Sequence, residues 1–342
     1  MAGNDSVPGG FVLRPLNERV IVVQILVMIF LCINLLQIVT FFKKECFYMT
    51  ARYILFAVTL LSDSLLLFIS DILLILSFYQ LAMDVWLCVI MMIVSFWYAV
   101  VTPVTLTAMT LERYVAICMP LHHGGLCSTR SILHGILIIH GLSSVPCIVV
   151  LSTFFSSASL SFYKQPKICA GQIFMLHVWQ EHVWSGVHQF YFLIILIILL
   201  FSYVKIMKVA RAASGEDKKA TWKGLRTVAL HGFQLLLCLI QLWCPFIETA
   251  VFQIDIMLFR NVRYFNYIMF SIAPKCLSPL IYGLRDETFF LALKNVVFYS
   301  LFNRTLRSRL PLNLFFCASA SLNLHALLCR DILMIFICIV TK

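Results

Sequence analysis

Seven stretches of this chain are long enough and apolar enough to cross a lipid bilayer as helices. A membrane-spanning helix needs about 20 consecutive apolar residues. The stretches cover residues 20–42, 53–79, 85–111, 131–153, 182–204, 227–250 and 264–284. Of the whole chain, 62% is hydrophobic and only 12% is charged, so there are too few charges to cover such a core in water. The sequence therefore predicts an all-α membrane protein, a seven-transmembrane helix bundle over residues 20–285.

Lysine and arginine are distributed unevenly among the segments that would join these helices. The loops after the first, third and fifth helices carry 12 of them, whereas the N-terminal segment and the loops after the second, fourth and sixth carry 6. Positively charged loops stay in the cytoplasm, so residues 1–19 are predicted to form an extracellular tail. The net charge of +11 then reflects orientation and attraction to anionic lipid rather than nucleic-acid binding. Asn4 opens an Asn-Asp-Ser sequon on that outer tail, which predicts glycosylation.

Two segments follow the last predicted span. Residues 286–302 place Phe and Leu in a helical pattern around Lys294, which predicts an amphipathic helix on the cytoplasmic membrane surface. Residues 303–342 form a C-terminal tail to which the pattern assigns no role.

Asn34, Asp63, Asp71 and Lys275 stand out among the polar residues inside the predicted spans, where such groups are costly and usually face the bundle interior. Asn34 lies in the first span, and Lys275 lies in the seventh. Asp63 and Asp71 are eight residues, or about 2.2 turns, apart in the second, so both are expected near one face. These groups either only stabilise the bundle or form a polar relay at a moving interface, and the sequence leaves both open.

Three short motifs mark the third, sixth and seventh spans. The third ends in Glu112-Arg113-Tyr114, a charged pair at the inner end of a transmembrane helix. The sixth contains Trp243-Cys244-Pro245, and the seventh contains Ser278-Pro279-Leu280-Ile281-Tyr282. Each proline removes a backbone hydrogen bond and can kink its helix.

In this order the motifs resemble those of rhodopsin-like (class A) G-protein-coupled receptors, and most closely those of fish odorant receptors, over about residues 20–300. The runs over 230–234 and 279–286 point to the odorant subgroup. The resemblance implies a chemosensory receptor of the plasma membrane that binds a small, weakly polar ligand, activates a heterotrimeric G-protein, and needs neither enzymatic activity nor a cofactor. The alternatives are a non-olfactory class A receptor and, less favoured, a multi-pass transporter or channel. The chain has no internal repeat typical of transporters and no motif of an intramembrane hydrolase or zinc site.

The resemblance also implies roles for particular residues. Glu112 would neutralise Arg113 at rest, and Trp243 would couple the ligand to a swing of the sixth helix about Pro245. The implied activation residues are Asn34, Asp63, Glu112, Arg113, Tyr114, Tyr203, Trp243, Pro245, Lys275, Ser278, Pro279 and Tyr282.

The implied ligand pocket lies between the third, fifth, sixth and seventh helices in their outer half. Its candidate lining residues are Ser95, Phe96, Ala99, Trp243, Phe246, Ile247 and Ala250. The family pattern further implies a disulfide between Cys88, at the outer end of the third helix, and Cys169, in the second outer loop.

The chain departs from the family pattern in three places. The fourth helix lacks the usual tryptophan, and Ser278 stands where Asn or Asp is common. Lys275 replaces a small polar residue that typically helps to hold a sodium ion near the aspartate of the second helix. Our hypothesis is that the Lys275 ammonium group pairs with Asp63 and takes the place of that ion.

Overall fold

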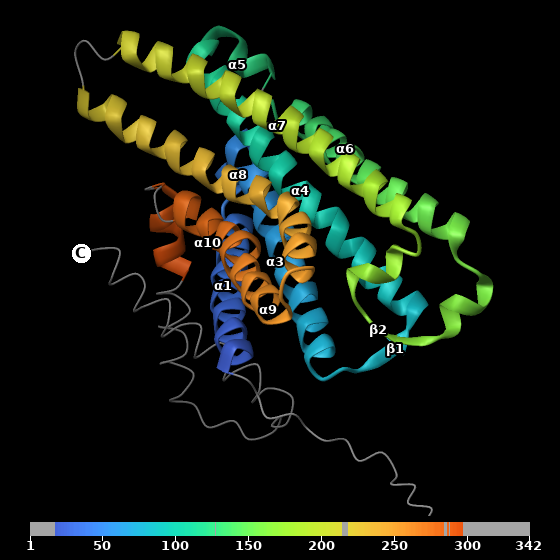
Figure 1. Cartoon of the computed structure of the whole chain (residues 1–342). Helices are drawn as coiled ribbons and strands as arrows, with labels where there is room; N and C mark the ends of the chain where they lie inside the picture. Colours follow the sequence, from blue (N-terminus) through green and yellow to red (C-terminus); the bar gives the residue numbers. More distant parts are fainter. Residues whose placement is uncertain (1–17, 127, 214–217, 284–285, 287, 297–342) are drawn as a thin grey trace, which may run out of the picture.

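The computed structural model describes residues 18–283 except 127 and 214–217, together with residue 286 and residues 288–296. The glycosylation expected at Asn4 and the tail over 303–342 lie outside these residues. Within them the chain is a bundle of long helices, shown in Figure 1. Six helices are long and apolar enough to cross a membrane. They are α1 (Glu18–Lys43), α3 (Ala51–Phe78), α4 (Val85–Cys118), α6 (Thr129–Ser157), α7 (Val178–Ala213) and α8 (Lys218–Phe252).

The seventh membrane-spanning segment is helical but broken into four parts. These are α9 (Ile256–Asn266), the π-helical η3 (Tyr267–Ile272), α10 (Ala273–Ser278) and the π-helical η4 (Pro279–Gly283). The two junctions that bound α10 fall beside Pro274 and Pro279, whose missing N–H groups interrupt the regular hydrogen-bond ladder. No single part therefore has the length of a membrane span, although the whole segment does.

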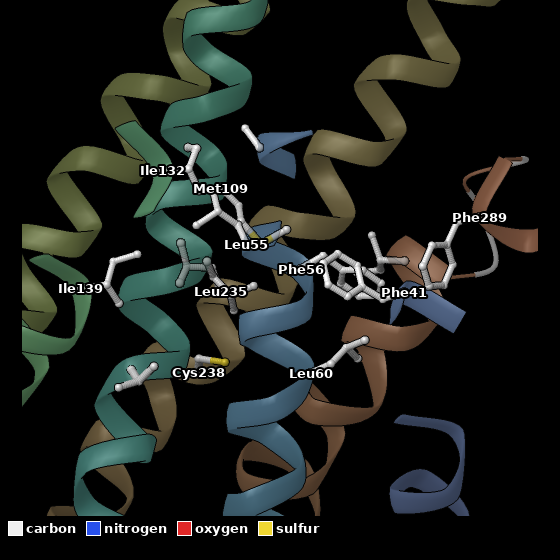
Figure 2. Close-up of a cluster of buried hydrophobic side chains, with 14 of the residues drawn as sticks. Phe41, Leu55, Phe56, Leu60, Met109, Ile132, Ile139, Leu235, Cys238 and Phe289 are labelled. Carbon is white, nitrogen blue, oxygen red and sulfur yellow. The ribbon is translucent and has the colours of Figure 1, made fainter. Parts of the chain in front are cut away.

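Helix α4 is the centre of the bundle, because α3, α6, α7 and α8 all pack against it. Helix α1 lies against α3 at one side. Figure 2 shows the largest buried cluster of apolar side chains, to which α1, α3, α4, α6, α8 and the helix over 288–296 all contribute. Lipid solvates the outer faces, so this interior is where the polar and charged side chains of the spans must find partners.

The fourth membrane helix, α6, is held without the tryptophan that the family usually places there. Trp97 of α4 donates its indole N–H to the His140 carbonyl oxygen of α6 at 3.4 Å, and the two rings meet edge to face. The Tyr191 hydroxyl of α7 donates to the Leu142 carbonyl oxygen at 2.7 Å. An indole from the neighbouring helix thus fills this interface.

Short elements close the two ends of the bundle. Figure 1 shows the strands β1 (Ala82–Asp84) and β2 (Pro166–Ile168) at one end, which is the predicted outer end. The two strands pair antiparallel. Strand β2 is joined to α6 by η1 (Leu160–Lys164) and to α7 by η2 (Gly171–Phe174). The opposite end carries α2 (Glu45–Tyr48), α5 (Pro120–Leu126) and the helix over 288–296.

Candidate functional site

A buried carboxylate lies at the middle of the bundle. Asp63 of α3 has no exposed surface, and two hydroxyl groups donate to it. Thr102 of α4 donates to its Oδ1 at 2.9 Å, and Ser278 of α10 donates to its Oδ2 at 3.0 Å. Asp63 therefore joins the second, third and seventh membrane helices through direct hydrogen bonds. Ser278, the residue that departs from the usual Asn or Asp, is one of its two donors.

Two buried glutamines connect the group formed by Asp63, Thr102 and Ser278, which we call the polar centre, to α8 and α1. Gln234 of α8 donates from Nε2 to the Ser278 hydroxyl at 2.5 Å and to the Pro274 carbonyl oxygen at 3.1 Å. Gln37 of α1 donates to the Pro279 carbonyl oxygen at 3.1 Å. Polar side chains of neighbouring helices commonly satisfy backbone groups where a membrane helix is interrupted by proline. The broken seventh segment is thus anchored from α1, α3 and α8.

Lys275 lies within the same region and is only 2% exposed. Its ammonium group donates to the Ser271 carbonyl oxygen at 2.5 Å, one turn earlier in the same segment. Its positive charge acts on Asp63, but the two side chains do not form an ion pair within 4 Å. The structure therefore places the two charges in one buried region without the direct contact that our hypothesis expected.

Asn34 and Asp71, the other two residues singled out in the sequence, have different surroundings. Asn34 is fully buried on α1, and within the described residues its side-chain amide makes no hydrogen bond. Asp71 is half-buried nearer the outer end of α3, and Gln24 of α1 donates to it at 2.5 Å. Asp63 and Asp71 thus occupy different environments although they lie about two turns apart near one face of the same helix.

The charged motif lies at the inner end of α4. Glu112, Arg113 and Tyr114 are all half-buried, and the Tyr114 ring contacts Phe201 of α7 at 5.7 Å between centroids. Tyr203, two residues further along α7, is also half-buried. Tyr282 lies in η4. The structure thus brings the third and fifth helices together beside Arg113.

Of the expected ligand-lining residues, those on α4 lie beneath the second outer loop. The Phe96 ring meets Phe174 of η2 at 5.7 Å and Trp184 of α7 at 5.3 Å, both edge to face. Ser95 is buried, and its hydroxyl donates to the Met91 carbonyl oxygen of its own helix. Ala99, one turn further in, is half-buried. This half of the site is therefore an aromatic enclosure.

The candidates on α8 form a second group. The Trp243 ring contacts Phe192 of α7 at 5.6 Å and Phe246 at 6.4 Å. Trp243 is 43% exposed and Ile247 is 41% exposed, and Ala250 is also exposed. Pro245 lies inside α8 between these residues. Trp243 is therefore partly exposed near the proline, and it packs on Phe192, which itself borders the main apolar cluster.

The expected disulfide between Cys88 and Cys169 is confirmed, with 5.4 Å between the two Cα atoms. Cys169 directly follows β2, and Cys88 lies in the first turn of α4, just after β1. Strand pairing and disulfide together fix the second outer loop against α4. The loop is further tied by Gln180, which accepts from the Leu176 and His177 backbone N–H groups and donates to Thr153 and Ser157 of α6.

Sequence reasoning missed several residues of the site, above all Thr102, Gln234, Phe174 and Trp184. Thr102 and Gln234 are both uncharged, and although Gln234 ends the run over 230–234, that run assigns it no partner. Only the rotation of their helices reveals that Thr102 and Gln234 face Asp63 and Ser278. Phe174 follows Cys169 by five residues, and the expected disulfide could have placed it above α4.

The sequence of the chain is similar to those of known proteins. The pattern of the family described as "7 transmembrane receptor (rhodopsin family)" matches residues 33–282. The chain is 42% identical over 299 residues to odorant receptor 131-2 of Danio rerio, which covers 87% of this chain and 92% of that protein. It is 24% identical over 207 residues to olfactory receptor 52J3 of Homo sapiens, covering 53% and 58% of the two chains. The polar centre, the outer disulfide and the broken seventh segment therefore belong to a multi-pass membrane protein of the rhodopsin family of seven-transmembrane receptors.

Proposed function

We propose that this receptor is an odorant receptor that binds a small, weakly polar ligand in the outer half of the bundle and activates a heterotrimeric G-protein. The observation that carries this proposal is the 42% identity to a zebrafish odorant receptor along nearly the whole chain. The aromatic enclosure around Phe96 supports the ligand class, because Phe174 and Trp184 offer ring faces and edges rather than charges.

Activation would proceed as a shift between two states of the bundle, of which the ligand binds one more tightly. A ligand between α4, α7 and α8 would contact Trp243, whose ring already packs on Phe192 of α7. Movement of that ring would be passed to the inner half of α8 at Pro245, where the helix lacks one backbone hydrogen bond. Arg113 would then leave Glu112 and turn toward the G-protein.

The polar centre would set the balance between these states. Hydrogen bonds from Ser278 to Asp63 and from Gln234 to Ser278 link α3, α10 and α8, which are the helices that must shift relative to one another. A buried network of this kind has a few discrete arrangements, so it favours switching over gradual deformation. The Lys275 ammonium group would supply there the positive charge that a sodium ion supplies in other members of the class.

Arg113→Ala should abolish signalling while leaving the receptor at the cell surface, because half-buried Arg113 would be the contact to the G-protein. The measurement is the cAMP response to a panel of small odorants in cells that express a stimulatory olfactory-type G-protein, divided by surface receptor. A transported solute or an ion current without a cAMP response would contradict the proposed function.

Phe96→Ala should raise the EC50 of an activating odorant by about tenfold, the effect of losing roughly 1.5 kcal/mol of apolar contact. Phe96 packs on two rings of the enclosure, whereas Phe68 is 53% exposed on α3 and serves as the matched control. Equal EC50 values for Phe96→Ala and Phe68→Ala would place the ligand elsewhere.

A further inference from the structure

A second charged cluster, outside the residues assigned so far, lies at the inner end of the bundle. Arg52, in the first turn of α3, donates from Nη2 to Asp286 Oδ2 at 2.8 Å. The neighbouring Tyr53 hydroxyl donates to Asp286 Oδ1 at 2.9 Å, and the Arg52 guanidinium lies over the Tyr53 ring. Asp286 follows the seventh membrane segment by three residues, so this contact spans 234 positions in the sequence.

Asp286 also fixes the start of the helix over 288–296. Its Oδ1 accepts from the Phe289 backbone N–H at 3.1 Å, which caps the first turn. Phe289 is fully buried and meets Phe47 of α2 and Phe56 of α3 at 5.1 and 5.5 Å. Figure 2 shows this ring beside Phe56 and Phe41. Arg52 therefore holds the carboxylate that positions this helix at the cytoplasmic end.

Arg52 also lies close to the charged motif of α4. The Thr59 hydroxyl of α3 lies 3.7 Å from the Met109 sulfur of α4, which sets the relative height of the two helices. From that level Arg52 is seven residues inward on α3, and Glu112 is three residues inward on the antiparallel α4. At 1.5 Å per residue, Arg52 and Glu112 lie roughly 10 and 5 Å along the helix axes from that level. A long arginine side chain can reach across the difference of about 5 Å. Of the two carboxylates, Asp286 attracts the Arg52 guanidinium more strongly and Glu112 more weakly.

We propose that Arg52 is a positioning residue for G-protein activation, a single cation shared between Asp286 and Glu112. While Asp286 neutralises Arg52, Glu112 remains available to hold Arg113. When the helix over 288–296 shifts and Asp286 withdraws, Arg52 attracts Glu112 and so helps to release Arg113. This inference rests on the roles proposed above for Glu112 and Arg113.

The shared-cation arrangement predicts opposite effects for the two members of one ion pair. Asp286→Asn keeps a side chain that can cap the Phe289 backbone N–H but removes the negative charge, so Arg52 turns to Glu112. We expect ligand-free signalling to rise by about threefold, the size of effect typical of a partly exposed charge interaction. Arg52→Gln removes the competitor for Glu112, so ligand-free signalling falls. The double variant Arg52→Gln/Asp286→Asn behaves like Arg52→Gln, because Asp286 acts through Arg52.

The test measures ligand-free cAMP in cells that express a stimulatory G-protein, divided by surface receptor from an N-terminal epitope tag. Arg52→Lys keeps the charge and stays near the parent level, and Lys44→Gln removes an exposed charge of the same inner loop without effect. Changes of the same sign in Arg52→Gln and Asp286→Asn, or a persisting rise in the double variant, would reduce the pair to an ordinary structural contact and overturn the inference.

An Arg113→Ala substitution in the Asp286→Asn background separates failure of this inference from failure of the proposed function. Loss of the raised signal there is expected. If the raised signal survives without Arg113, the role proposed for Arg113 is wrong. If it disappears but the two single variants agree in sign, only the shared-cation inference is wrong.

Discussion

Lys275→Ala should leave little receptor at the cell surface. The substitution leaves the Asp63 carboxylate fully buried with two hydroxyl partners and no nearby positive charge. Removing one member of a buried pair of charges costs about 3–5 kcal/mol, a large share of a typical folding free energy. Because Lys275 and Asp63 are not in direct contact, we expect the lower end of that range, about 3 kcal/mol. Surface labelling and the thermal stability of detergent-solubilised receptor measure the loss.

The double variant Lys275→Ala/Asp63→Asn should recover part of that loss, since the neutral amide can accept the Thr102 hydroxyl at its oxygen and donate its NH2 group to the Ser278 hydroxyl oxygen. Lys164→Ala, which removes an exposed lysine of the outer loop, is the control for loss of a positive charge alone. The parent should also signal equally in sodium and choline buffers if the Lys275 ammonium group replaces the ion. Absence of any recovery, together with sodium sensitivity of the parent, would refute this role of Lys275.

Cys88→Ser should release the second outer loop from α4 and strongly reduce folding. Cys88 and Cys169 are 81 residues apart in the sequence, and for a loop of that length chain-entropy relations give about 4.5 kcal/mol. The strands that remain are only three residues long each, and an isolated two-stranded sheet of that size is barely stable. The Gln180 contacts to α6 would persist but hold only the far end of the loop.

Surface labelling and ligand response report this loss, and Cys169→Ser should reproduce it. The Cys88→Ser/Cys169→Ser double variant should be no worse than either single variant, because both remove one bond. Cys46→Ser changes an exposed free cysteine on α2 and should have no effect. Normal surface levels and responses of Cys88→Ser would show that strand pairing alone suffices.

The polar centre illustrates how far sequence reasoning reaches. Charged residues are easily recognised within apolar runs, so the sequence predicts that Asp63 and Lys275 face the bundle interior. Both side chains are buried in the structure. Their actual partners were not identified. The Lys275 ammonium group bonds the Ser271 carbonyl oxygen, and Asp63 accepts from Thr102, a residue without any pattern of its own. Which side chains form hydrogen bonds with each other depends on how each helix is rotated about its own axis, to within a fraction of a turn. The hydropathy of the sequence does not determine that rotation.

The seventh membrane segment makes the same point for secondary structure. Its apolar length and Pro279 predict a kinked span. The division into α9, η3, α10 and η4 was not readable, because Gln37 of α1 and Gln234 of α8 bond the carbonyl oxygens of Pro279 and Pro274. Gln37 lies 242 residues from Pro279 in the sequence, and Gln234 lies 40 residues from Pro274. These contacts stabilise a local geometry that the segment by itself does not specify.

By itself, the sequence determined the membrane class, the seven spans and the predicted orientation, because the thickness of the bilayer and the need to satisfy every backbone hydrogen bond allow few alternatives for such apolar runs. Its motifs also led to the receptor family and to the Cys88–Cys169 disulfide. Only the tertiary structure decided which side chains meet, such as Ser278 with Asp63, Phe174 with Phe96 and Arg52 with Asp286. The physical reason is that apolar length fixes where a helix begins and ends in lipid, whereas the face it turns inward is settled by packing against helices distant in the chain.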